Sequence, residues 1–130
     1  MPAGEVVAPD GQRQLQRAVR TAEHVSGLTF SVYVGTSGAD PRAFAEQRHA
    51  DLPAAEDAVL VMCDPERRAL EIVTGSRARR LLDDVDCRLA AASMQVSFAA
   101  DDLLGGLVTG VQQLGQSARH PRTLHTARIS

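Results

Sequence analysis

The stretch that most limits the fold of this chain lies between residues 56 and 75. Residues 58–62 are all apolar, which is typical of a strand that is covered on both of its faces. The next segment, 64–67, has the sequence Asp-Pro-Glu-Arg and suits a type I turn with proline in second position. Residues 69–74 then alternate between apolar and polar side chains. Together these segments predict a β-hairpin whose second strand lies nearer the edge of a sheet.

The segments before the hairpin predict a helix, a strand and a second helix. Residues 12–26 place apolar side chains at three- and four-residue spacing, and Asp10 is expected to cap that helix. Residues 28–34 alternate as a strand does. The pair at 40–41, Asp-Pro, predicts a helix that reaches about Ala50, because proline at the first helical position gives up an N–H that has no partner anyway.

The segment after the hairpin predicts one or two short helical turns and then two longer helices. Asp84 or Asp86 is expected to cap the first of these, which runs to about residue 96. Its expected buried stripe consists of Val85, Leu89, Ala92 and Val96. Asp101 and Asp102 precede the last helix, where carboxylates are favourable. The apolar face of that helix consists of Leu103, Leu107, Val111 and Leu114. Three glycines inside it, at positions 105, 106 and 110, indicate close packing against a neighbouring element.

These elements follow the order αβαββαα and define one α/β domain. The first two strands and the helix between them form a βαβ unit, so these strands are expected to be parallel. The hairpin adds an antiparallel strand, and the helices are expected to flank the small mixed sheet on both faces. At 130 residues the chain is long enough for one core. We assign the domain to residues 10–117 and predict flexible ends at 1–9 and 118–130.

Composition and charge exclude several classes of function. Hydrophobic residues make up 44% and charged residues 23% of the chain, as in ordinary globular proteins. The net charge of -2 gives no reason to expect a nucleic-acid partner. No membrane-length apolar run and no leader sequence is evident, which predicts a cytoplasmic location without direct membrane insertion. Cys63 and Cys87 lie in apolar surroundings, so two buried free thiols are expected, with a disulfide or redox pair as the alternative.

Acidic residues near the ends of the hairpin are candidate metal ligands. Glu56 opens one strand and Asp84 follows the exit of the other, so both are expected at the same rim of the sheet. Hard cations such as Ca²⁺ and Mg²⁺ require several oxygen ligands that converge. We therefore take Glu56, Asp57 and Asp84 as predicted ligands. The alternative is that Asp84 or Asp86 caps a helix, while the other acids, including Asp83, are solvated.

Basic residues after the hairpin are candidate anion ligands. Gly75 and Ser76 open a helical segment that contains Arg77, so backbone N–H groups and a guanidinium could hold a phosphate there. We take Gly75 and Arg77 as the predicted anion site. The alternative is an exposed helix face with ordinary charge neighbours, such as Arg80 beside Asp83. Two further arginines, Arg67 and Arg68, are expected at the hairpin turn, at the far end of the sheet.

No catalytic residue is assigned from the sequence. His24 and His49 fall late in predicted helices, where a cation suits the helix dipole, and capping or surface roles are expected for both. The chain contains no serine-nucleophile elbow, P-loop, HExxH or GxGxxG motif.

The hairpin and the element order together resemble a known family. The family pattern is an acidic residue, Asn, a small residue and an apolar strand, followed by a polar turn and a strand that ends in glycine. In this chain the first three positions are Glu56, Asp57 and Ala58, and the strand, turn and second strand follow at 59–62, 64–68 and 70–75. Residues 100–107, Ala-Asp-Asp-Leu-Leu-Gly-Gly-Leu, resemble the polar turn and glycine-containing last helix of the same family. On these residues, roughly 12–117, the chain resembles the TPM domain, and in particular small actinobacterial TPM-like proteins.

The resemblance implies two kinds of function. One is a non-enzymatic interaction module with a protein partner, and this is the function we expect. The alternative is a weak metal-dependent phosphatase that uses Glu56 and Asp84 with Ca²⁺ or Mg²⁺. The resemblance implies this because phosphatase activity and calcium binding have been attributed to plant TPM proteins. Many TPM domains continue the strand with Gly-Tyr-Gly and an acidic residue, where this chain has Gly75, Ser76 and Arg77.

Overall fold

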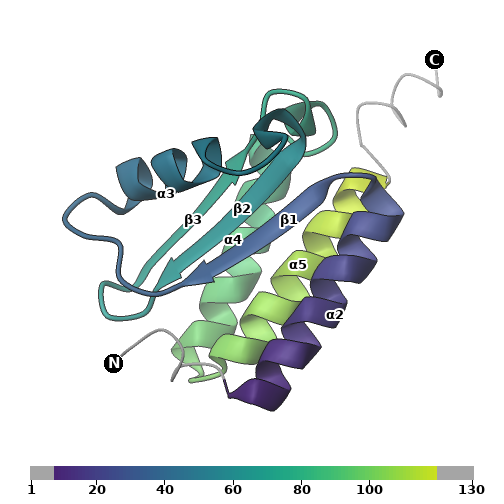
Figure 1. Ribbon diagram of the computed structural model, residues 1–130. Helices are drawn as coiled ribbons and strands as arrows, with labels where there is room; N and C mark the ends of the chain where they lie inside the picture. Colours follow the sequence, from purple (N-terminus) through teal and green to yellow (C-terminus); the bar gives the residue numbers. More distant parts are fainter. Residues whose placement is uncertain (1–7, 120–130) are drawn as a thin grey trace.

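The computed structural model describes residues 8–119 and has the expected order αβαββαα (Figure 1). Its elements are α2 (Pro9–Ser26), β1 (Thr29–Val34), α3 (Pro41–Ala50), β2 (Ala58–Asp64), β3 (Ala69–Thr74), α4 (Asp84–Ala99) and α5 (Leu103–Arg119). Two short 3₁₀ turns, η1 (Ala55–Asp57) and η2 (Ala78–Arg80), flank the hairpin. Most of the predicted flexible ends, 1–9 and 118–130, lies outside the described residues. Where they overlap, residues 9 and 118–119 are helical.

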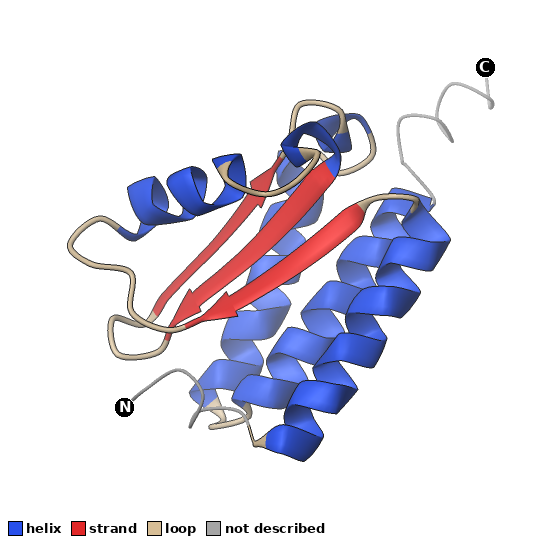
Figure 2. Ribbon diagram, in the orientation of Figure 1, coloured by secondary structure: helices blue, strands red, loops and turns tan. Residues whose placement is uncertain are grey.

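The sheet has three strands in the order β1-β2-β3. β1 and β2 are parallel, with Thr29 opposite Ala58, and β2 and β3 are antiparallel, with Val59 opposite Thr74. Figure 2 shows α3 on one face of the sheet, and α2, α4 and α5 on the other. The predicted mixed sheet with helices on both faces is therefore confirmed.

The central strand β2 supplies side chains to both layers of the core. All of its residues are buried. Val59, Val61 and Cys63 belong to the core beneath α2, α4 and α5, whereas Leu60 and Met62 belong to the smaller core beneath α3. Because successive side chains of a strand point to opposite faces, a strand covered on both sides must be apolar at nearly every position.

Two helix starts differ from the sequence prediction. The N-cap of α2 is Ala8, with proline at the first helical position, and Asp10 lies in the first turn instead of capping it. The N-cap of α4 is Asp83. Its carboxylate accepts the N–H of Asp86 at 2.9 Å, and the Asp86 carboxylate accepts the N–H of Asp83 at 3.2 Å. In this reciprocal capping box Asp86 is buried, and its carboxylate is bonded to the backbone of the helix start.

The predicted buried stripe of α4 is wrong. Val85, Leu89 and Val96 are 36%, 55% and 73% exposed, and α4 instead turns Ala90 and Met94 towards the core. The cause is the neighbouring helix, because Gly110 on α5 leaves a notch that the Met94 side chain fills. A Cβ placed at Gly110 would lie 2.4 Å from the Met94 sulfur. The predicted close packing is thus confirmed for Gly106 and Gly110, which lie against α4, but not for Gly105, where an added Cβ would meet the side chain of Asp102 just before α5. The contact at Gly110 decides which face of α4 is buried.

The hairpin loop and the loop after β1 are joined by a buried carboxylate. The hairpin loop spans residues 65–68, one residue later than predicted. Within it, the Arg68 N–H donates to the Pro65 carbonyl at 3.2 Å. Asp64, at the end of β2, is 1% exposed. Its Oδ2 accepts the N–H of Ser37 at 2.9 Å and the Ser37 hydroxyl at 2.7 Å. Asp64 therefore ties the β1 exit to the end of β2.

The outer edge of β3 is covered by two arginines. Arg42 of α3 donates to the Ile72 carbonyl at 3.1 Å, and Arg79 of η2 donates to the Thr74 carbonyl at 3.0 Å. Arg42 also pairs with Glu71 across the same strand at 3.2 Å. These contacts satisfy backbone acceptors that an edge strand otherwise leaves to solvent.

Candidate functional site

Three of the predicted site residues come together at the rim where β3 leaves the sheet. The Arg77 guanidinium binds the Asp57 carboxylate through two hydrogen bonds, of 2.9 Å and 2.6 Å, and also reaches a Glu56 oxygen at 3.3 Å. The hydrogen bond from Arg77 holds the pKa of Asp57 below its ordinary value, although partial burial acts in the opposite direction. Glu56 and Asp57, predicted to bind a metal, are thus paired with the arginine predicted to bind an anion.

Gly75 also lies at this rim, and the backbone of η1 passes so close to it that no side chain fits there. A Cβ at Gly75 would lie 2.0 Å from the carbonyl oxygen of Ala55 and 2.5 Å from the carbonyl carbon of Glu56. The Gly75 N–H donates to Ala58 at 2.9 Å, and the Arg77 N–H donates to Glu56 at 2.8 Å. Both N–H groups of the predicted anion site are therefore engaged within the fold, and the glycine has a packing role.

Asp84, the third predicted metal ligand, lies apart from this cluster. It is the first residue of α4, is exposed, and shares a shallow depression beside β3 with Arg79 and Arg88. Across residues 8–119 there is no group of three or more His, Cys, Asp or Glu side chains suited to hold a metal ion. The metal and anion sites therefore remain predictions from the sequence.

The thiols and the second histidine are parts of the packing. Cys63 is buried, Cys87 is half-buried, and both are free. Burial, together with nearby aspartates, raises the pKa of each thiol to about 11, so both are neutral near neutral pH. His49 is buried instead of lying on the surface as expected, and its Nε2 lies 3.0 Å from the Ala58 carbonyl oxygen.

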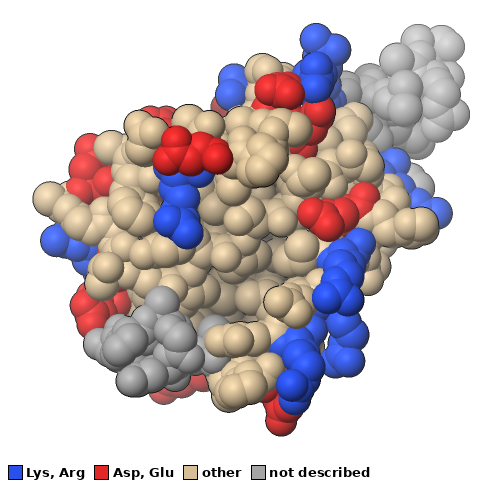
Figure 3. All heavy atoms as spheres, in the orientation of Figure 1, with Lys and Arg blue, Asp and Glu red and all other residues tan. Residues whose placement is uncertain are grey.

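The outward side of α4 is the most unusual surface among the described residues. We define the α4 face as four exposed residues in consecutive turns: Val85, Leu89, Ala92 and Val96. No charged residue occurs between Leu89 and Ala100. By contrast, basic side chains gather along the edge of the molecule formed by α2, which carries arginines at positions 13, 17 and 20 (Figure 3).

A helix that carries apolar residues on two opposite sides typically packs against a neighbour on each of these sides. Ala90 and Met94 are covered by the fold, whereas Leu89 and Val96 have no covering element in the part of the chain that the structure describes. The sequence pattern identified these residues as a stripe but assigned them to the core, which Ala90 and Met94 face instead. The surplus of apolar positions around α4 was the signal that not all of them face the core.

The fold and these surfaces define a small α/β domain with an exposed apolar helix. The chain belongs to the family described as "Domain of unknown function (DUF5130)", which matches residues 6–115. No helix within residues 8–119 has the length and apolar character needed to cross a bilayer.

Similar proteins include one from Mycobacterium tuberculosis and two solved structures from other bacteria. The uncharacterized protein Rv2468c of Mycobacterium tuberculosis is 26% identical over 113 residues, which are 87% of this chain and 64% of that protein. The chain thus spans less than two thirds of this relative. The NMR structure of BA42 from the psychrophilic bacterium Bizionia argentinensis has a TM-score of 0.75 at 19% identity, covering 86% of this chain and 81% of BA42. The N-terminal domain of cg2496 from Corynebacterium glutamicum has a TM-score of 0.71 at 16% identity, covering 86% and 74%.

Proposed function

We propose that this chain is a TPM-like, non-enzymatic interaction module that binds a helix of a partner protein through the α4 face. The observation that carries the proposal is the exposure of Val85, Leu89 and Val96 along one side of a well-packed helix. Contiguous exposed apolar side chains mark protein interaction sites on soluble domains. The TPM-like assignment is supported by the element order and by the hairpin at residues 56–75.

The residues around the α4 face favour a helical and apolar partner surface. Ala92 and Ser93 are small and exposed beside Leu89, so a second helix can approach closely and pack against the larger side chains. The absence of charge from Leu89 to Ala100 leaves no group to pair with a charged partner surface. Arg88, at the beginning of the face, is available to fix the direction of a partner that carries an acidic residue there.

Substitution of Leu89 by arginine is expected to leave the domain folded. The side chain is 55% exposed, so Leu89→Arg should change the free energy of unfolding by less than about 0.5 kcal/mol. Met94→Ala, on the covered side of the same helix, should cost about 2–4 kcal/mol. Urea unfolding of both variants measures the difference. A large loss of stability in Leu89→Arg would show that another part of this chain covers the α4 face.

The partner is tested with cross-linking in cells of the source organism, followed by mass spectrometry that maps the linked residues. We expect links from α4 to an apolar helix of one partner, lost in Leu89→Arg and Val96→Asp. Gln16→Arg, on the exposed side of α2, is the matched control and should keep them. Ultracentrifugation of the purified protein shows whether the α4 face binds a second copy of this chain, because the chain would then sediment as a dimer. Links that survive both α4 substitutions would overturn the proposal.

The alternative proposal, a weak metal-dependent phosphatase, is supported by the family resemblance alone. It predicts that millimolar Ca²⁺ or Mg²⁺ raises the melting temperature, because a ligand of the folded state stabilises it. Asp84→Ala should abolish that rise. Under the interaction proposal neither cation changes the melting temperature, so differential scanning fluorimetry separates the two functions.

A further inference from the structure

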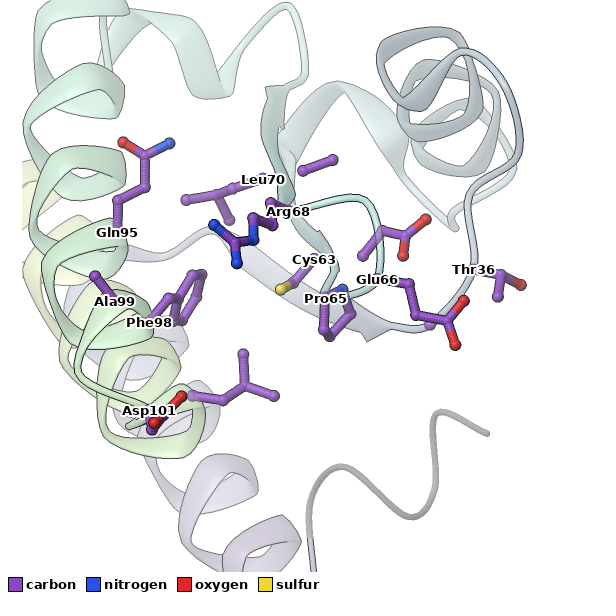
Figure 4. Close-up of a pocket in the computed structure, with 14 residues that line it drawn as sticks. Thr36, Cys63, Pro65, Glu66, Arg68, Leu70, Gln95, Phe98, Ala99 and Asp101 are labelled. Carbon is purple, nitrogen blue, oxygen red and sulfur yellow. The ribbon is translucent and has the colours of Figure 1, made fainter. Parts of the chain in front are cut away.

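A cleft of about 720 Å³ opens at the end of the sheet opposite Gly75 (Figure 4). It lies between the hairpin loop 65–68, the loop after β1 and the C-terminal half of α4. This is the side of the carboxyl ends of the parallel strands β1 and β2, where open α/β sheets bind their ligands. The volume falls within the range of small-molecule sites.

The walls of this cleft are mostly apolar. Phe98 and Ala99 of α4 face Leu70 of β3 and the neutral thiol of Cys63 across it (Figure 4). Gln95 adds an amide on the α4 wall. An apolar wall with a few polar groups is the usual lining of a site for a small organic molecule.

Arg68 is the basic residue among those lining the cleft, and its guanidinium has no partner among the residues that the structure describes. It extends towards the α4 wall, near Phe98 and Gln95 (Figure 4). The guanidinium makes no ion pair or hydrogen bond with any residue in 8–119, unlike Arg42 and Arg77. Its backbone has a φ of 53°, a left-handed conformation that glycine adopts readily and that a side chain disfavours. Strained residues of this kind collect at ligand sites.

The charges around Arg68 narrow the class of ligand. Glu66, Asp101 and the buried Asp64 also line the cleft. With one cation among several carboxylates, a doubly charged phosphate is disfavoured relative to a single negative charge. The guanidinium fork matches a carboxylate. We propose that the cleft binds a small amphiphilic monocarboxylate, with its carboxylate on Arg68 and its apolar body against Phe98 and Leu70.

The experiment is a titration of the ¹⁵N-labelled full chain with octanoate, followed by NMR. We expect saturable shifts confined to residues that line the cleft. Arg68→Gln should weaken binding by about tenfold or more, the loss expected for a charge-assisted hydrogen bond. Arg67→Gln, the neighbouring exposed arginine that does not line the cleft, should bind as the unaltered protein does. Arg68→Gly should lose binding while its melting temperature stays the same or rises.

Three results would overturn this proposal. One is the absence of saturable shifts at millimolar octanoate, or shifts that lie elsewhere and persist in Arg68→Gly. The second is equal binding of octanol, which would remove the role of the carboxylate. The third is tighter binding of octyl phosphate, which would assign the cleft to a different ligand class. Leu89→Arg should bind octanoate normally, so the outcome is independent of the α4 face.

Discussion

Gly75→Ala is expected to destabilise the domain by about 3 kcal/mol, at the upper end of the cost of overpacking. The new Cβ would lie 2.0 Å from the Ala55 carbonyl oxygen, and the atoms near it, in Ala55 and Glu56, belong to the backbone. A backbone segment cannot rotate away as a flexible side chain can, so η1 must move as a unit. That movement would also pull on the Gly75 hydrogen bond to Ala58 and on Arg77.

Gly38→Ala is the matched control for this prediction. Gly38 has a φ of 82°, and a Cβ added to it would have nothing within 4 Å, so alanine there meets conformational strain without a steric clash. The expected cost is about 1 kcal/mol. Urea unfolding of the two variants separates the effects. Equal losses would contradict the assignment of Gly75 to close packing.

Asp64→Ala is expected to destabilise the domain by about 2–4 kcal/mol. The substitution removes the acceptor for the Ser37 N–H and for the Ser37 hydroxyl, both in a buried position. A buried donor without a partner costs about 1–3 kcal/mol. Ser37→Ala removes only the hydroxyl and keeps the backbone contact, so it should cost about 1 kcal/mol. Similar losses in both variants, measured by urea unfolding, would argue against this role of the carboxylate.

The same carboxylate makes stability depend on pH. Burial alone would raise the pKa of Asp64, but the hydrogen bonds from Ser37 and from the N–H groups of Glu66 and Arg67 lower it below the ordinary aspartate value. The unfolded chain therefore takes up a proton before the folded one does. The contribution of Asp64 is complete above an ordinary aspartate pKa of about 3.9 and is lost as the pH falls below it. Asp64→Asn should flatten the acid side of the stability profile.

Much of the fold could be predicted because its local patterns agree with its tertiary contacts. The apolar run of β2 requires cover on both faces, and the short βαβ connection fixes parallel pairing with β1. Asp40 caps α3 as predicted, since its carboxylate accepts the Ala43 N–H at 3.1 Å. The cap of α3 and the burial of β2 follow from contacts within a few residues or from the two-residue period of a strand, and the parallel pairing follows from the geometry of a βαβ unit.

The candidate sites were harder to predict because they depend on contacts distant in sequence. The α4 face was found as a stripe but placed inside, since periodicity cannot tell which side meets Gly110. Glu56 and Asp84 were predicted at one rim, whereas the structure pairs Glu56 and Asp57 with Arg77 there. Arg68 was placed at the hairpin turn correctly, yet no local signal shows that Phe98 faces it across a cleft.

The two arginines on the outer edge of β3 hinder the pairing of this strand with strands of other copies of the protein. Arg42 comes from α3 and Arg79 from η2, so they reach the Ile72 and Thr74 carbonyls only after both elements have docked. Before that point β3 offers its edge to the strands of other copies, which is how aggregation begins. Cover of the β3 edge therefore depends on the docking of both elements, and detachment of either one exposes a backbone acceptor to other copies.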